Sequence, residues 1–173
     1  MYIVRFILYT LLNEMFYIIS QAHIHTSKQT YMAFLYVLRN LVGKTYLGVS
    51  RHPLTRLKQH NSPARSLQKH YTNRNRPWTM AAVFSGFVTR AQALRAEYTV
   101  KHRPQRIRHS VAIVARIATA QATCNHLLRK DNNFRGVKAL SVVIWEQNLH
   151  HAVHSLTSSR TVAGDGVTVH YVG

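Results

Sequence analysis

Two short runs rich in β-branched and aromatic residues, FLYVLR and KTYLGV, most constrain the fold of this chain. The segment 40–43 between them, NLVG, has the residue types of a tight turn. Two such runs joined by a short turn predict an antiparallel hairpin. Pro53 follows and suits the first turn of a helix, so we predict a helix to about Asn61 with Leu54 and Leu57 on one face.

The residues that follow complete an α+β pattern. Residues 62–77 are polar and basic, and Pro63 and Pro77 break regular structure, which predicts a long surface loop. The run TMAAVFSGFV is typical of a third strand. Thr89 can cap a second helix, RAQALRAEYTVKH, that ends before Pro104. The face of this helix is expected from four residues at helical spacing: Ala93, Leu94, Tyr98 and Lys101.

The N-terminal segment, residues 1–31, is apolar but is broken by Arg5, Asn13 and Glu14. Its uninterrupted apolar run is much shorter than the ~20 residues of a membrane span, so stable membrane insertion is not expected. A cleaved signal peptide is an alternative, although no clear small-residue cleavage site follows the apolar run. We expect an appendage, or a consequence of start-site choice, because Met32 opens a compact segment.

After residue 103 the pattern is less regular. The run HSVAIVARIATAQATCNHLL looks helical, and VKALSVVIWEQNL is compatible with a strand or a helix. We therefore predict three parts: an apolar appendage (1–31), a small α+β domain with a three-stranded antiparallel sheet flanked by helices (32–103), and a basic, mainly helical C-terminal extension (104–173). The extension can pack on the domain or contact a ligand.

Charge points to a polyanionic partner. There are 23 Lys and Arg against 5 Asp and Glu, a formal net charge of +18, and 12 His add positive charge below about pH 6.5. Nucleic acid is the first candidate; a solvated basic face or an anionic membrane surface are the alternatives.

Cys124 is the single cysteine, which excludes an intramolecular disulfide and a cysteine-rich zinc module and fits a reducing compartment. Cys124 lies in an apolar helical pattern that favours burial rather than a nucleophilic role. The histidine groups 23/25 and 150/151/154 lack an obvious thiolate or carboxylate partner, so solvation is favoured over zinc binding.

The distribution of carboxylates is informative. From residue 15 to residue 130 the only acidic residue is Glu97. One carboxylate in so basic a segment suits a hard divalent cation. The alternative is an ion pair within the helix, to Arg90, Arg95 or Lys101.

Two further pairs are candidates for a site. Arg56 and His60 are spaced i, i+4 on the first helix and are expected to project opposite the leucines, where they could clamp a phosphate and shuttle a proton. Two exposed polar residues are the alternative. Tyr36 and Tyr46, on the predicted hairpin, are equally compatible with packing.

Four strings together resemble a known family: FLYVLRN, KTYLGVSRHPLTRLKQHN, RPWTMAAVFSGF and ALRAEYTVKH. Over residues 34 to about 103 their order and spacing resemble the GIY-YIG nuclease superfamily. The first signature triplet is degenerate, LYV at residues 35–37, and the second is YLG at residues 46–48. The PW, GF and RLKQHN motifs most resemble those of the structure-selective nucleases that cut branched DNA. Viral and bacterial single-domain relatives are similar in many of these motifs.

The resemblance implies roles for the candidate residues. Glu97 matches the glutamate that holds Mg²⁺ or Mn²⁺ against the scissile phosphate, and Arg56 matches the arginine that stabilises charge on it. Tyr36 and Tyr46 match the paired tyrosines that orient or deprotonate the attacking water. His60 matches a proton-transfer group or phosphate ligand.

Gly48 matches a glycine that lets backbone and substrate approach closely. A phenol with a pKa near 10 is a poor base at neutral pH, so we expect Arg56, His60 or metal-bound water to lower it. Val49 stands where some repair relatives carry a lysine that assists the base, and the RING-like module of eukaryotic members, which contacts a scaffold partner, cannot form here.

The sequence thus predicts a Mg²⁺- or Mn²⁺-dependent DNA endonuclease, a phosphodiester hydrolase of repair or recombination acting on branched or flap DNA, with a scaffold protein as a possible further partner. It is expected inside the cell with DNA: the nucleus in a eukaryotic or viral setting, the cytoplasm in a bacterial one. The alternatives are a catalytically inactive nucleic-acid-binding protein and a membrane-surface protein. A sequence-independent DNA contact is predicted from six basic residues: Lys44, Lys58, Arg65, Lys69, Arg74 and Arg76.

Overall fold

The predicted hairpin and third strand form the centre of the fold. The computed structural model describes residues 33–63, 71–103, 107–137, 139–158 and 167–171. Strands β1 (Phe34–Asn40) and β2 (Thr45–Ser50) form the hairpin, and β3 (Trp78–Ser85) pairs antiparallel with the other side of β1. The three strands and their antiparallel pairing are as predicted from strand-forming residues separated by turn residues.

The sheet continues beyond these three strands. Strand β4 (Leu140–Ile144) pairs antiparallel with β3, and β5 (Val167–Tyr171) pairs parallel with β4, giving the order β2-β1-β3-β4-β5 among the described strands. The α+β class is confirmed, and two strands from the C-terminal part extend the predicted sheet. All residues of β4 are buried, so its apolar run shows no alternation that would separate a strand from a helix.

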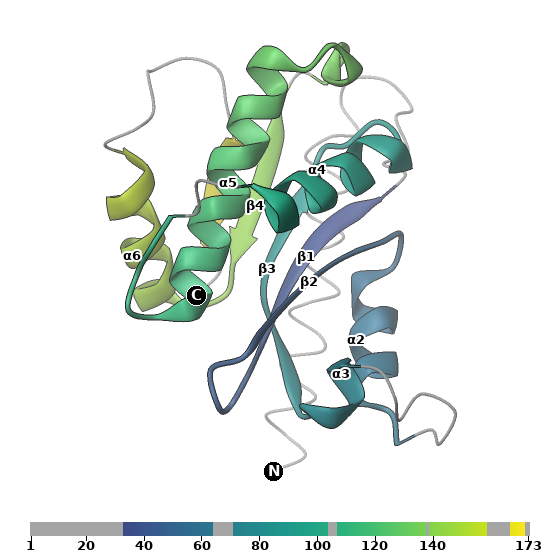
Figure 1. The fold of residues 1–173 in the computed structure, drawn as a ribbon, viewed down its shortest axis with the longest axis vertical. Coiled ribbons are helices and arrows are strands. Elements are labelled where there is room, and N and C mark those ends of the chain that lie inside the picture. Colours follow the sequence, from purple (N-terminus) through teal and green to yellow (C-terminus); the bar gives the residue numbers. More distant parts are fainter. Residues whose placement is uncertain (1–32, 64–70, 104–106, 138, 159–166, 172–173) are drawn as a thin grey trace. The chain divides into compact units, whose positions relative to one another are not determined.

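The two faces of the sheet have separate cores because neighbouring strand residues point to opposite sides. Leu35 and Val37 belong to the larger core, with α4 (Arg90–His102) and α5 (Ala112–Lys130). Tyr36 and Leu38 belong to the smaller core on the opposite face. Helices α2 (Pro53–Asn61) and α3 (Tyr71–Arg74) adjoin each other, as do α4 and α5 (Figure 1).

The C-terminal part adds the rest of the larger core. Helix α5 is where a helix was predicted, and its Cys124 is fully buried, as expected from its pattern. Leu149 and Val153 of α6 (Gln147–Ser158) join the same core, and a short 3-10 turn, η2 (Asn132–Phe134), supplies Phe134. Residues 31–173 form one compact unit. The predicted division at residue 103 stays a prediction.

The expectations for residues 1–31 lie outside the described residues. In the part of the chain that the structure does describe, none of the helices combines the length and apolarity needed to span a bilayer.

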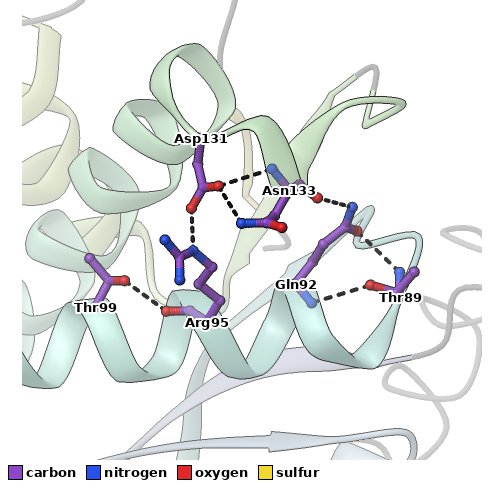
Figure 2. A network of polar contacts seen from close by, with 6 residues as sticks. All are labelled: Thr89, Gln92, Arg95, Thr99, Asp131 and Asn133. Atoms are coloured by element: carbon purple, nitrogen blue, oxygen red, sulfur yellow. Dashed lines mark hydrogen bonds and ion pairs between the residues drawn. The ribbon is translucent and has the colours of Figure 1, made fainter.

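Helix α4 begins with the predicted cap. The Thr89 side chain accepts a hydrogen bond from the Gln92 backbone N–H, and Gln92 Oε1 accepts from the backbone N–H groups of Val88 and Thr89. Gln92 Nε2 also donates to the Asn133 carbonyl at 2.8 Å, and Arg95 forms an ion pair with Asp131 (Figure 2). The start of α4 is thereby tied to the segment that follows α5.

We expect Gln92→Ala to lower the free energy of unfolding by about 1–3 kcal/mol. The substitution leaves the Asn133 carbonyl and the N–H groups before α4 without their partner, and Gln92 is buried. Chemical denaturation measures the change, with the exposed Gln147→Ala as control. Equal stabilities of the two variants would contradict the bridging role of Gln92.

The predicted face of α4 is wrong. The residues buried against the sheet are Gln92, Ala93, Ala96 and Val100, whereas Leu94 and Tyr98 are exposed. Small alanine side chains let α4 approach the sheet closely, so packing selects the narrow face of the helix rather than its largest apolar side chains. Lys101 is also exposed.

The predicted loop 62–77 contains a short helix. Helix α3 lies within it, and the Trp78 indole N–H donates to the Thr72 carbonyl at 2.6 Å. Asn61 exchanges two hydrogen bonds with the Trp78 backbone, at 2.8 and 2.9 Å. The end of α2 and the helix α3 are thus both held at the start of β3.

Candidate active site

Two tyrosines and a glycine meet on the smaller-core face of the hairpin. Tyr36 pairs with Gly48 across the strands, and Tyr46 lies on the same face with ring centroids 6.2 Å apart. A Cβ atom on Gly48 would lie 2.6 Å from Tyr36 Oη and 2.9 Å from Tyr46 Cε1. Gly48 therefore makes room for the tyrosine rings, and the predicted close approach of the substrate there stays a prediction.

His60 lies between the tyrosines. Its Nε2 is 2.9 Å from Tyr36 Oη in a buried hydrogen bond, and its ring centroid is 4.9 Å from that of Tyr46, edge to face. The expectation that His60 projects opposite the leucines of α2 is wrong: His60 is buried and Leu57 packs against the same core. Residues 53, 57 and 60 share one helical face, and this face contacts the sheet.

Arg56 stands one turn before His60 and is exposed. Its Nη1 donates to Gln59 Oε1 at 2.8 Å, and its charge is close enough to act on the pKa of Tyr36. A pocket of about 200 Å³ opens beside these side chains. Its lining residues are Tyr46, Arg56, Gln59, His60, Tyr71, Thr72 and Asn73.

The electrostatics differ from the expectation that Tyr36 is acidified. Burial raises the pKa of Tyr36 well above its ordinary value, and the charges of Tyr46 and Glu97 raise it further. Arg56 lowers this pKa, but its effect is smaller than the sum of the others. Burial and the Arg56 charge lower the pKa of His60 to about 4. His60 is therefore uncharged at neutral pH and does not supply a positive charge to the phenol.

The lowered pKa of His60 predicts a pH dependence of stability. The unfolded chain binds a proton on this histidine near pH 6.5, whereas the folded chain binds it only near pH 4. The free energy of unfolding should fall by about 1–3 kcal/mol as pH decreases from 6.5 towards 4. Denaturation across this range, compared with His60→Gln, isolates the contribution. Parallel pH profiles of the two proteins would contradict it.

Glu97 approaches the site from α4. Its charge is close enough to raise the pKa of Tyr36, and its ion pair with Lys101, at 2.6 Å, is the helical pair considered as an alternative. Lys101 Nζ in turn lies 5.9 Å from the Tyr46 ring centroid. The structure thus brings Tyr36, Tyr46 and His60 into contact, places Arg56 in the same pocket lining as Tyr46 and His60, and places Glu97 nearby, outside that lining.

The residues near the pocket fit a single hard cation. Glu97 offers a carboxylate, and Mg²⁺ is commonly held by one or two carboxylates with substrate phosphates and water as further ligands. The other described carboxylates, Asp131 and Glu146, are ion-paired with Arg95 and Arg39. Within the described ranges no group of three or more His, Cys, Asp or Glu side chains is placed to hold a metal ion.

The predicted DNA-contacting residues have different environments. Lys44 donates to the Asn75 side chain at 2.6 Å, and Lys58 and Arg74 are exposed. Arg76 donates to the carbonyls of Asn73 and Ser62, so it also holds the segment around α3 in place. Arg65 and Lys69 lie outside the described residues. The DNA contacts of all six remain predictions.

Sequence reasoning missed several residues of the pocket wall. Gln59, Thr72 and Asn73 line it, and Trp78 lies beside it with its ring centroid 6.3 Å from Tyr46 and 6.0 Å from Tyr71. The proximity of Gln59 to His60 in a helix that was predicted to carry the site is the one signal that could have identified Gln59. Thr72 and Asn73 gave none, because the loop was expected to be irregular.

Comparison with protein families agrees with this geometry. Residues 32–108 match the family model described as the GIY-YIG catalytic domain. The match includes all five residues of the candidate site: Tyr36, Tyr46, Arg56, His60 and Glu97.

Curated relatives share the same region. The chain is 36% identical over 92 residues to a structure-specific endonuclease subunit SLX1 homolog of Leishmania major, covering 50% of this chain and 13% of the relative. It is 36% identical over 74 residues to the structure-specific endonuclease subunit slx1 of Aspergillus terreus (41% and 19%) and 39% identical over 77 residues to that of Penicillium rubens (43% and 19%). The matched region thus spans less than a fifth of the length of each of these relatives.

Proposed function

We propose that this chain, whose residues 32–108 match the GIY-YIG catalytic domain model, is a divalent-metal-dependent DNA endonuclease that hydrolyses phosphodiester bonds, acting on branched or flap DNA in repair or recombination. The observation that carries the proposal is that Tyr46, Arg56 and His60 line one pocket and that the buried Tyr36 hydrogen bonds to His60 behind it. The relatives named structure-specific endonuclease subunits support the substrate class.

Arg56 is the group that stabilises negative charge. Its guanidinium is exposed at the pocket and can donate to two oxygens of a phosphate at once. Charge grows on these oxygens as water attacks phosphorus, so a donor fixed in place there lowers the barrier. The bond to Gln59 holds Arg56 before substrate arrives.

Tyr36 and His60 accept and transfer the proton of the attacking water. With its raised pKa, Tyr36 keeps its proton, and with Nδ1 protonated, His60 Nε2 accepts the hydrogen bond from Tyr36 Oη. As the water oxygen bonds to phosphorus, its proton passes to Tyr36 Oη while the phenolic proton passes to His60 Nε2. The departing oxygen takes a proton from solvent. The bound phosphate favours this step because its negative charge raises the proton affinity of His60.

Glu97 is the residue that would hold the metal. A bound Mg²⁺ or Mn²⁺ would supply Lewis-acid stabilisation of the phosphate oxygens. In this chain Glu97 keeps its carboxylate in place through the ion pair with Lys101, whose Nζ also lies over the Tyr46 ring.

The setting of the reaction follows from the substrate. Cleavage of branched DNA places the protein in a compartment that holds DNA. The relatives are named as subunits, so we include a scaffold protein among the possible partners. The positive charge of +18 supports a sequence-independent grip on the phosphate backbone.

The test is cleavage of end-labelled duplex, flap and four-way-junction DNA by the full chain in Mg²⁺, with binding measured in parallel. We expect the branched substrates to be cut at least about tenfold faster than the duplex, at a defined distance from the branch. Tight binding without cleavage of any substrate would overturn the proposal and favour the inactive nucleic-acid-binding protein.

A further inference from the structure

A second pocket, of about 440 Å³, lies on the other side of the hairpin edge. Its polar wall consists of Thr45, Arg108, His109, Arg116 and Thr119, and no Asp or Glu is among the described residues that line it. Its apolar floor includes Val100 and Ile107. A cavity that combines cationic groups with a small apolar floor suits a phosphate attached to a sugar.

The polar groups of this second pocket are held in place. Arg116 Nε donates to Thr45 Oγ1 at 3.3 Å, which holds the guanidinium beside β2. His109 Nδ1 accepts from the Val111 backbone N–H at 3.0 Å, so in the neutral ring the proton is on Nε2. The Nε2–H of His109 and the exposed guanidinium of Arg108 add two more donors suited to an anion.

The relation between the two pockets is set by the geometry of β2. Thr45 lines the second pocket and Tyr46, the next residue, lines the first. Successive side chains of a strand point to opposite faces, so the pockets lie on opposite faces of the sheet. Strand β2 is the terminal strand of the described sheet, so a polyanion can pass around this edge from one pocket to the other.

We propose that the second pocket binds a backbone phosphate of a second arm of the branched DNA while the first pocket holds the scissile phosphate. The inference rests on the proposed function, because it takes the substrate to be branched DNA. A short linear duplex occupies one face of the sheet, whereas a junction sends one arm to each face. The second pocket would therefore distinguish branched from linear DNA.

The test compares the full-length wild type with Arg108→Ala/Arg116→Ala in metal-free buffer, so that binding is measured without cleavage. Affinity for a four-way junction should fall about tenfold or more, while affinity for a short duplex changes by less than about twofold. The slope of log affinity against log salt for the junction should decrease by about two, one for each lost phosphate contact.

The control is Arg129→Ala/Arg135→Ala, which removes the same charge from two exposed arginines outside both pockets. It should weaken junction and duplex binding equally and slightly. A loss in the pocket variant that matches the control, or that is the same for junction and duplex, would overturn the proposal.

Two further measurements keep the test decisive. If the double variant folds poorly, Arg108→Ala alone replaces it, because it removes an exposed side chain. This single variant should show about half of the change in the salt slope. Thermal unfolding with inorganic phosphate identifies the ligand source: stabilisation of wild type but not of the variant, with junction affinity unchanged, would assign the pocket to a free anion and overturn the assignment to DNA. If wild type binds junctions but cuts nothing, the proposed function fails, while the binding comparison still decides the role of the pocket.

Discussion

Glu97→Gln is expected to slow DNA cleavage by about 10²–10³-fold while DNA binding is kept or strengthened. The amide keeps the size of the side chain but removes the negative charge that holds a divalent cation. It also removes a charge that repels DNA, so affinity should not fall. The ion pair with Lys101 is partly exposed, and its loss should change the free energy of unfolding by less than about 1 kcal/mol.

The measurement is single-turnover cleavage of a flap substrate across a Mg²⁺ titration, repeated with Mn²⁺ and after chelation. The matched control is Glu146→Gln, which breaks the ion pair with Arg39 and lies outside the family match. This control should cleave at the wild-type rate. If Glu97→Gln cleaves normally with an unchanged metal requirement, Glu97 is only the ion-pair partner of Lys101, and the metal site has to be sought elsewhere.

Gly48→Ala is expected to reduce cleavage by about tenfold or more and to lower the free energy of unfolding by about 1–3 kcal/mol. The added methyl group would lie 2.6 Å from Tyr36 Oη and 2.7 Å from Tyr36 Cζ, closer than non-bonded atoms approach. Tyr36 is buried and bound to His60, so its ring cannot turn away without breaking that hydrogen bond. Packing and the proposed proton path are therefore disturbed together.

Gly43→Ala is the matched control, because it makes the same chemical change in the hairpin turn with no atom within 4 Å of the new Cβ. Gly43 has a φ of +79°, so alanine there costs some stability through backbone strain. It should leave cleavage unchanged. If Gly48→Ala and Gly43→Ala lose stability equally and both cleave normally, then the close approach at Gly48 has no role in catalysis.

The local elements could be predicted because each rests on a few neighbouring residues. The turn at residues 40–43, Pro53 at the start of α2 and the Thr89 cap of α4 all act within one turn of the chain. The α+β class and the resemblance to the GIY-YIG nucleases followed from the order of these elements. The residues of the candidate site could also be predicted from the sequence. The spacing shared with the GIY-YIG family identified Tyr36, Tyr46, Arg56, His60 and Glu97 without knowledge of how they pack.

The features that could not be predicted depend on what packs against each element. The buried face of α4 is set by the space above β1 and β2, which admits Ala93 and Ala96 and excludes Leu94. The burial of His60, and hence its neutral state, depends on the sheet beneath α2. The strand β4 is apolar throughout, and only its pairing with β3 distinguishes it from a helix.

The position of β4 also has a consequence for folding during synthesis on the ribosome. The strands β2, β1 and β3 are synthesised first, but the outer edge of β3 gains its partner only when Leu140–Ile144 emerges, about 55 residues after Ser85. At the usual rates of translation this interval lasts about 3–11 s. For that time a nascent chain presents an open, apolar strand edge that can pair with another copy. Efficient production of this protein should therefore depend on chaperones that bind nascent chains, and on a low concentration of those chains, more than on the stability of the finished fold.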